Sequence, residues 1–130
     1  MEEYKIFLVE DDIIFLEMLK ETLHEEGDYK IHAFHTGEEC LNNIHLQPHI
    51  VVLDYYLNSK KADAKNGMEI LKEINRRAPG TKVIILSGQE DASLVYNFNS
   101  EKAADYIIKD ENAFDNIKHS IKEILEDIDE

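Results

Sequence analysis

The sequence has little of what marks several common protein classes. Cys40 is its only cysteine, so no disulfide can form within the chain, and we expect a reducing compartment. Met1 is followed by acidic residues rather than a basic segment, and no apolar run is long enough to cross a bilayer. We therefore expect a cytoplasmic protein without membrane contacts. No G-x-G-x-x-G or G-x-x-x-x-G-K-[ST] pattern follows an apolar run, which argues against a nucleotide cofactor.

Basic residues are also scarce. The chain has 14 Lys and Arg against 28 Asp and Glu, a net charge of −14 at pH 7. Such a chain is repelled by phosphate backbones, so we do not expect it to bind nucleic acid directly. Its 43% hydrophobic and 32% charged residues are typical of a globular protein, and 130 residues suffice for one domain but not for two. We expect a single domain over residues 1–130.

Short apolar runs alternate with amphipathic segments along the chain. The apolar runs predict strands at residues 5–9, 29–34, 50–53, 82–86 and 105–108. Apolar residues at helical spacing predict helices at residues 14–23, 36–45, 68–77, 91–98 and from 111 onward. This alternation is typical of an α/β fold with a parallel, doubly wound sheet and helices on both faces.

Polar residues follow four of the predicted strands. Glu10 and Asp11 follow the first, Asp54 the third, Ser87 the fourth and Lys109 the fifth. The carboxyl ends of parallel strands share one edge of the sheet, where ligands bind in such folds. Three carboxylates there repel one another unless a hard cation such as Mg²⁺ (or Mn²⁺) binds them. With a lysine and a hydroxyl added, the set indicates a carboxylate nucleophile that attacks phosphorus.

Each of these residues taken singly has a commoner structural role. An aspartate after a strand usually caps a helix or a turn, an acidic cluster is usually a solvated helix start, and a lysine at a strand end is usually on the surface. A serine before glycine is usually part of a turn. Only their coincidence at the ends of the correct strands is specific.

The motifs KIFLVEDD, LDYYL, ILSG and DYIIK carry a resemblance over essentially the whole chain. The sequence resembles a response-regulator receiver domain of two-component signalling, in the CheY-like superfamily. The resemblance implies a flavodoxin-like (βα)5 sandwich with a five-stranded parallel sheet in the order 2-1-3-4-5. It also implies that Asp54 is the phosphoacceptor. Glu10 and Asp11 would be the metal-binding carboxylates, Asp54 would also bind the metal, and the backbone carbonyl of Tyr56 would be a further ligand.

The resemblance also implies the remaining roles. Lys109 and Ser87 would assist phosphoryl transfer, while Ser87 and Tyr106 would switch the protein between two states. Tyr56 and Gln89 match the two positions that tune hydrolysis of the phosphoryl group. Because a bulky Tyr56 could shield the acyl phosphate from water, we expect slow autodephosphorylation.

Partners follow from the same resemblance. The phosphoryl donor would be a sensor histidine kinase or a histidine phosphotransfer protein. A downstream protein would bind the face made by the fourth helix, the fifth strand and the fifth helix. The protein would be a monomer or a phosphorylation-dependent dimer, and it would catalyse only its own phosphorylation and dephosphorylation rather than act as an enzyme on another substrate.

Two alternatives remain open at this point. A Mg²⁺-dependent aspartyl-phosphate phosphatase of the haloacid-dehalogenase type also uses an aspartate at a strand end, but it needs a second aspartate where Tyr56 stands. An unphosphorylated docking module is the other alternative, although every chemical residue is present. The chain is either a stand-alone regulator or one domain of a longer protein.

The sequence departs from the family pattern in three places. Asp110 replaces the proline that usually follows the lysine after a cis peptide bond, so we expect a trans bond or a strained loop there. The loop of residues 58–67 after the acceptor is longer than usual and carries three lysines. Lys102 stands where glycine is common.

Overall fold

Runs of β-branched and leucine residues form the centre of a parallel sheet in the computed structural model, which describes residues 3–55, 67–88 and 102–129. The strands are β1 (Tyr4–Val9), β2 (Tyr29–Phe34), β3 (Ile50–Asp54), β4 (Lys82–Ser87) and β5 (Asp105–Ile108). They form a five-stranded sheet in the order β2-β1-β3-β4-β5, and every neighbouring pair is parallel. The predicted fold and strand order are confirmed. Every residue of β3 is buried, as its continuous apolar sequence predicts.

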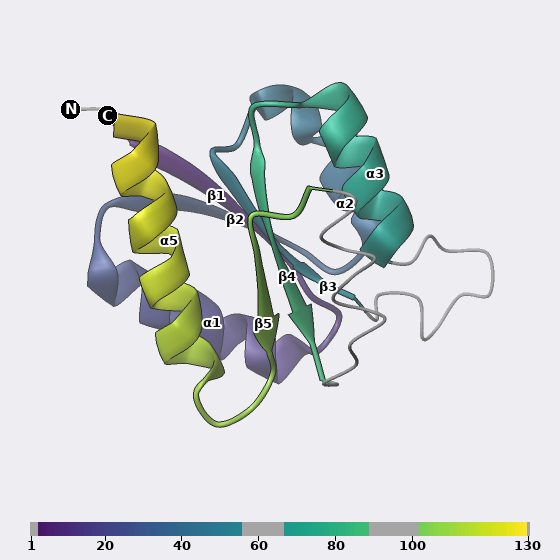
Figure 1. The fold of residues 1–130 in the computed structure, drawn as a ribbon. Coiled ribbons are helices and arrows are strands. Elements are labelled where there is room, and N and C mark those ends of the chain that lie inside the picture. The colour runs from purple at the N-terminus through teal and green to yellow at the C-terminus, as the bar shows by residue number, and fades with distance from the viewer. Residues whose placement is uncertain (1–2, 56–66, 89–101, 130) are drawn as a thin grey trace.

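Helices cover both faces of the sheet (Figure 1). On one face, α1 (Ile13–Glu26) and α5 (Ala113–Asp129) pack on Ile6 and Leu8 of β1. On the other, α2 (Gly37–Asn42) and α3 (Gly67–Arg77) pack on Phe7 and Val9. Successive side chains of a strand point to opposite faces, so one short apolar run supplies both cores.

The helix predicted at residues 36–45 is shorter in the structure. Thr36 caps α2 as its sequence predicts, because its Oγ1 accepts a hydrogen bond from the Glu39 amide at 3.1 Å. The helix ends at Asn42, and a separate 3₁₀ turn, η1 (Ile44–Leu46), follows. At the break, the side chain of Asn43 donates a 2.8 Å hydrogen bond to the carbonyl of Glu39. Such side-chain bonds to the backbone compete with helix continuation.

Two predicted segments lie largely outside the described residues. They are the helix at residues 91–98 and the long loop at residues 58–67, of which only Gly67 is described, as the first residue of α3. Elsewhere the Lys109–Asp110 bond is trans, which is one of the two expected outcomes. No helix in the described part of the chain is both long and apolar enough to span a membrane.

The two ends of the chain meet at the edge of the sheet where the strands begin (Figure 1). The hydroxyl of Tyr4 donates a hydrogen bond to the carboxylate of Asp129, near the end of α5. All five strands run from this edge toward the opposite one. The side chains that the sequence singles out lie at that opposite edge.

Candidate functional site

Three carboxylates converge where β1 and β3 end. Ligand oxygens of Glu10, Asp11 and Asp54 lie within 4.8 Å of one another. Glu10 is 1% exposed and Asp54 is 3% exposed, whereas Asp11 is half-buried. The sequence correctly predicts that these residues meet, although Asp54 is more deeply buried than a strand end that reaches the surface would suggest.

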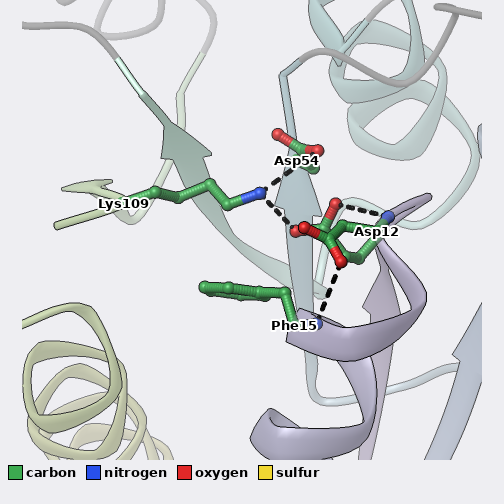
Figure 2. A network of polar contacts seen from close by, with 5 residues as sticks. Asp12, Phe15, Asp54 and Lys109 are labelled. Atoms are coloured by element: carbon green, nitrogen blue, oxygen red, sulfur yellow. Dashed lines mark hydrogen bonds and ion pairs between the residues drawn. The ribbon is translucent and has the colours of Figure 1, made fainter. Parts of the chain in front are cut away.

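Lys109 completes the cluster from the end of β5 (Figure 2). Its Nζ lies 2.6 Å from Glu10 Oε1 and 3.7 Å from Asp54 Oδ2. Its backbone amide donates a 2.7 Å hydrogen bond to the carbonyl of Ser87, which ties the lysine to β4. Its Nζ also lies 4.4 Å from the centroid of the Phe15 ring, a cation–π contact that favours the charged amine. The backbone hydrogen bond to Ser87 and the contact with Phe15 therefore hold the ammonium group of Lys109 beside the carboxylates.

Burial and mutual repulsion shape the charges at this edge. The pKa of Glu10 rises to about 8, first because the side chain is buried and then because Asp54 bonds and repels it, while Lys109 and the Asp12 amide act in the opposite direction. Burial lowers the pKa of Lys109, but the hydrogen bond to Glu10 and the nearby charge of Asp54 outweigh it, so the net shift is upward. The two pKa shifts favour the protonated forms of both side chains, the charged amine of Lys109 and the neutral carboxyl of Glu10.

The donor set fits a hard divalent cation. It consists of carboxylate oxygens alone, which Mg²⁺ and Mn²⁺ prefer. Asp11 is only half-buried, so one side of the cluster is open to solvent. Burial is the main cause of the raised pKa of Glu10, and the hydrogen bond and negative charge of Asp54 add to it, so a cation between these carboxylates would favour their charged forms. Glu10, Asp11 and Asp54 are therefore the residues that could hold Mg²⁺.

The other predicted site residues occupy neighbouring positions. Ser87 is fully buried at the end of β4, and β4 pairs directly with β3. Tyr106 is half-buried in β5 and packs against the core under α2 and α3. Tyr56 and Gln89 lie outside the described residues, so their proposed roles stay predictions.

The sequence analysis missed three residues that support the site. Asp12 caps α1, accepting a 3.1 Å hydrogen bond from the Phe15 amide, while its own amide donates to Glu10 Oε2 at 3.2 Å. Phe15 stacks on Phe114 of α5, with ring centroids 5.0 Å apart, and this fixes the ring under Lys109. An aspartate directly before the first apolar residues of a helix, here Ile13 and Ile14, is an N-cap signal that could have identified Asp12.

Gly67 is the third of these residues. Its amide donates a 3.0 Å hydrogen bond to the carbonyl of Tyr55, directly after the acceptor strand. A Cβ atom at this position would lie 2.7 Å from Tyr55 Cα and 3.2 Å from the Asp54 carbonyl oxygen. Only glycine allows α3 to start so close to the strand that carries Asp54.

Comparison with known proteins decides the family. A family model for the response regulator receiver domain matches residues 6–122. The chain belongs to this receiver domain family. The match covers the end of β1, β3, β4 and β5, so the carboxylate cluster and Lys109 lie within it.

Individual receiver proteins agree with this assignment. The chain is 27% identical to the chemotaxis protein CheY of Thermotoga maritima over 107 residues, which cover 81% of this chain and 85% of CheY. It is 28% identical to the transcriptional regulatory protein DegU of Brevibacillus brevis over 113 residues, which cover 84% of this chain but only 45% of DegU. This receiver chain thus spans less than half the length of DegU.

Solved receiver structures have the same fold. The BeF3-activated DrrB receiver domain superimposes with a TM-score of 0.83 at 32% identity, over 96% of this chain and 99% of that one. The DrrB response regulator of Thermotoga maritima gives the same TM-score at 30% identity, over 96% of this chain and 54% of DrrB. The resemblance inferred from the sequence motifs is confirmed for the family and for the fold.

Proposed function

We propose that Asp54 accepts a phosphoryl group in a Mg²⁺-dependent reaction and thereby switches a protein-interaction face. The observation that carries this proposal is the position of Lys109, which points its charge at two buried carboxylates where the strands end. A lysine and carboxylates buried together at the sheet edge suit chemistry on a phosphoryl group better than they suit fold stability. Membership of the receiver family supports the same function.

The proposed transfer makes one bond and breaks another. A carboxylate oxygen of Asp54 attacks phosphorus, and the bond from phosphorus to the donor's histidine nitrogen breaks, leaving an acyl phosphate and a free imidazole. Lys109 would offset negative charge on the phosphoryl oxygens, and the Ser87 hydroxyl would donate a hydrogen bond to one of them. A divalent cation held by Glu10, Asp11, Asp54 and the Tyr56 carbonyl would supply further charge stabilisation.

The protein would act on itself and on no separate substrate. After phosphorylation, we propose that Ser87 and Tyr106 move toward the new group and change the surface that includes β5 and α5. The fourth helix predicted from the sequence, residues 91–98, would belong to this surface. A downstream protein would read the change, and the phosphorylated form would be a monomer or a dimer.

We further propose that the phosphoryl donor is a protein in the cytoplasm, either a sensor histidine kinase or a histidine phosphotransfer protein. Exposed apolar side chains lie on the first turns of α1, directly after the Asp12 cap: Ile13 is 61% exposed, Ile14 is 74% exposed and Met18 is 50% exposed. An apolar group of this kind beside an acceptor supports contact with a protein rather than with a small donor alone.

Intact-mass spectrometry after incubation with acetyl phosphate tests the proposal. We expect one phosphoryl adduct with Mg²⁺, none with EDTA, and none in Asp54→Ala. Asp12→Asn is the matched control, because it removes a neighbouring carboxylate charge but keeps a good helix cap. Absence of an adduct with acetyl phosphate and with histidine kinases, in a folded protein that binds Mg²⁺, would favour the docking module instead.

A further inference from the structure

A groove runs along the edge of the sheet where the strands begin, opposite the Asp54 edge. Three hollows of about 600, 360 and 220 Å³ adjoin one another there. Pro79 and Thr81 line both the first and the third, Ile128 lines the first and the second, and Lys82 lines the second and the third. Each hollow thus shares lining residues with the other two, so the three adjoin one another, and together we call them the amino-edge groove.

The amino-edge groove is cationic on an acidic molecule. Arg77, Lys82 and Lys102 line it, and His45 and His49 lie at one end. Among its described lining residues Asp127 is the only acidic one, although the whole chain has a net charge of −14. Basic residues therefore outnumber acidic ones in the lining, although Arg77 Nε lies 3.4 Å from Glu73 Oε2, and this excess favours an occupant with negative charge.

Backbone strain is concentrated in the same groove. Gln47 (φ 56°) and Lys102 (φ 60°) are the only non-glycine residues with positive φ in the described part of the chain. Gln47 lines the first hollow and Lys102 lines the third. Side chains in this backbone conformation are strained, and such residues cluster at functional sites. Lys102 combines a strained backbone conformation with a cationic side chain that lines the groove.

Shape and apolar surface narrow the choice of occupant. The hollows are open to solvent rather than enclosed, which suits a peptide lying on the surface better than a small molecule, since small-molecule sites bury most of their ligand. Ile128, a large hydrophobic residue that is 40% exposed, offers an apolar contact between the cationic positions. A long polyanion such as nucleic acid is disfavoured because the rest of the molecule would repel it.

We propose that the amino-edge groove binds an acidic peptide segment of a partner protein. An apolar side chain of the segment packs on Ile128, and its carboxylates meet Arg77, Lys82 and Lys102. The site lies at the opposite end of the strands from Asp54 and does not depend on phosphorylation of that residue.

Fluorescence anisotropy of the full chain with labelled nine-residue peptides tests the proposal. The first peptide is built from glutamate with a central leucine, and the second has glutamine in place of glutamate. We expect the acidic peptide to bind at least about tenfold more tightly than its glutamine analogue, and Arg77→Glu to weaken binding by about tenfold. The control is Lys30→Glu, which also replaces a basic side chain by an acidic one, at an exposed position of β2 outside the groove lining, and should have less than about a twofold effect.

A second variant protects the test against misfolding. Lys82→Gln removes a groove cation from an exposed position, and we expect it to weaken binding while circular dichroism stays unchanged. Equal loss in Lys30→Glu and Arg77→Glu would overturn the proposal, because attraction would then depend on net charge alone. Equal binding of the two peptides would overturn the proposal, because the groove would then not select for negative charge. Displacement of the acidic peptide by inorganic phosphate, added at the same concentration as the protein, would instead indicate a site for small anions and would also overturn it.

Discussion

Lys109 Nζ lies closer to Glu10 than to Asp54, at 2.6 Å against 3.7 Å. The lysine therefore pairs most closely with Glu10, a proposed metal ligand, and forms a longer ion pair with Asp54, the proposed acceptor. This pairing leaves the nearby Asp54 carboxylate with a positive charge beside it. The charges of four side chains at this edge of the sheet therefore influence one another: Glu10, Asp11, Asp54 and Lys109. The predictions about the site follow from this electrostatic coupling.

The metal-free protein should lose stability as the pH rises. Burial and Asp54 raise the pKa of Glu10 from 4.5 to about 8, so between these values the folded protein keeps a proton that the unfolded chain has released. The stabilisation is complete below pH 4.5 and is lost as the pH passes through about 8. We expect urea unfolding in EDTA to show a fall of at most about 1.4 kcal/mol per pH unit between pH 6 and 8.

Glu10→Gln is the control for this pH effect, because it keeps the side-chain shape and removes the titration. Its unfolding free energy should change less with pH over the same range. Mg²⁺ should bind the wild-type protein more tightly as the pH rises, with release of protons, since the metal needs the deprotonated carboxylate. Calorimetry in two buffers of different ionisation enthalpy measures that release. Parallel pH profiles for the two proteins would show that Glu10 does not hold the proton.

Replacing Lys109 should slow phosphorylation without unfolding the protein. Lys109→Met keeps the contact with Phe15 but removes the charge that faces Asp54. We expect the rate of adduct formation from acetyl phosphate to fall by about 100-fold, comparable to the loss of one charge-stabilising group in other active sites. Lys20→Met, in an exposed pair with Glu17, is the control. A change below twofold at Lys109 would count against its proposed role.

A methyl group at Gly67 should disturb the acceptor strand. Gly67→Ala would place Cβ 2.7 Å from Tyr55 Cα, and backbone atoms cannot move aside as a side chain can. We expect a loss of about 1–3 kcal/mol in unfolding free energy, together with slower phosphorylation. Gly80→Ala is the matched control, since nothing lies within 4 Å of its Cβ position. Equal stabilities of the two variants would contradict this account of Gly67.

Glycine at position 102 should stabilise the protein. Lys102 has φ 60°, a conformation that costs about 1–2 kcal/mol for a residue with Cβ, and glycine avoids this cost while losing part of the gain to its more flexible unfolded chain. We expect Lys102→Gly to gain up to about 1 kcal/mol in thermal or urea unfolding. Lys102→Ala keeps the strain and should gain nothing, so equal effects of the two substitutions would rule strain out. Under the groove proposal, Lys102→Gly should also bind the acidic peptide less tightly.

The sequence alone predicts structural features that repeat with a simple period and residues that lie at the end of a strand. The continuous apolar run of β3 and the position of Asp54 directly after Leu53 could be read without coordinates, and so could the position of Lys109 at the end of β5. The strand order came from the family resemblance, because apolar runs alone do not say which strands are neighbours. The structure confirms the positions of these strands and the strand order.

Other features depend on contacts between distant segments. Helical spacing shows that Phe15 is apolar, but not that its ring lies beneath Lys109. The length of α2 was overestimated because a capping box marks where a helix starts, whereas here the Asn43 side chain competes with the backbone where it ends. The amino-edge groove is built from α3, α5, η1 and strand ends, and no linear pattern joins them.

The hydrogen bond between Tyr4 and Asp129 has a consequence for how information crosses the domain. Anything attached at either end of this chain leaves from one spot, while the proposed phosphorylation occurs at the far tips of the strands. The two places are separated by the length of a strand such as β3, whose five residues extend roughly 16 Å. A signal that travels through the domain from Asp54 to the two ends of the chain must therefore cross the length of the sheet, through changes in the packing of side chains along the strands.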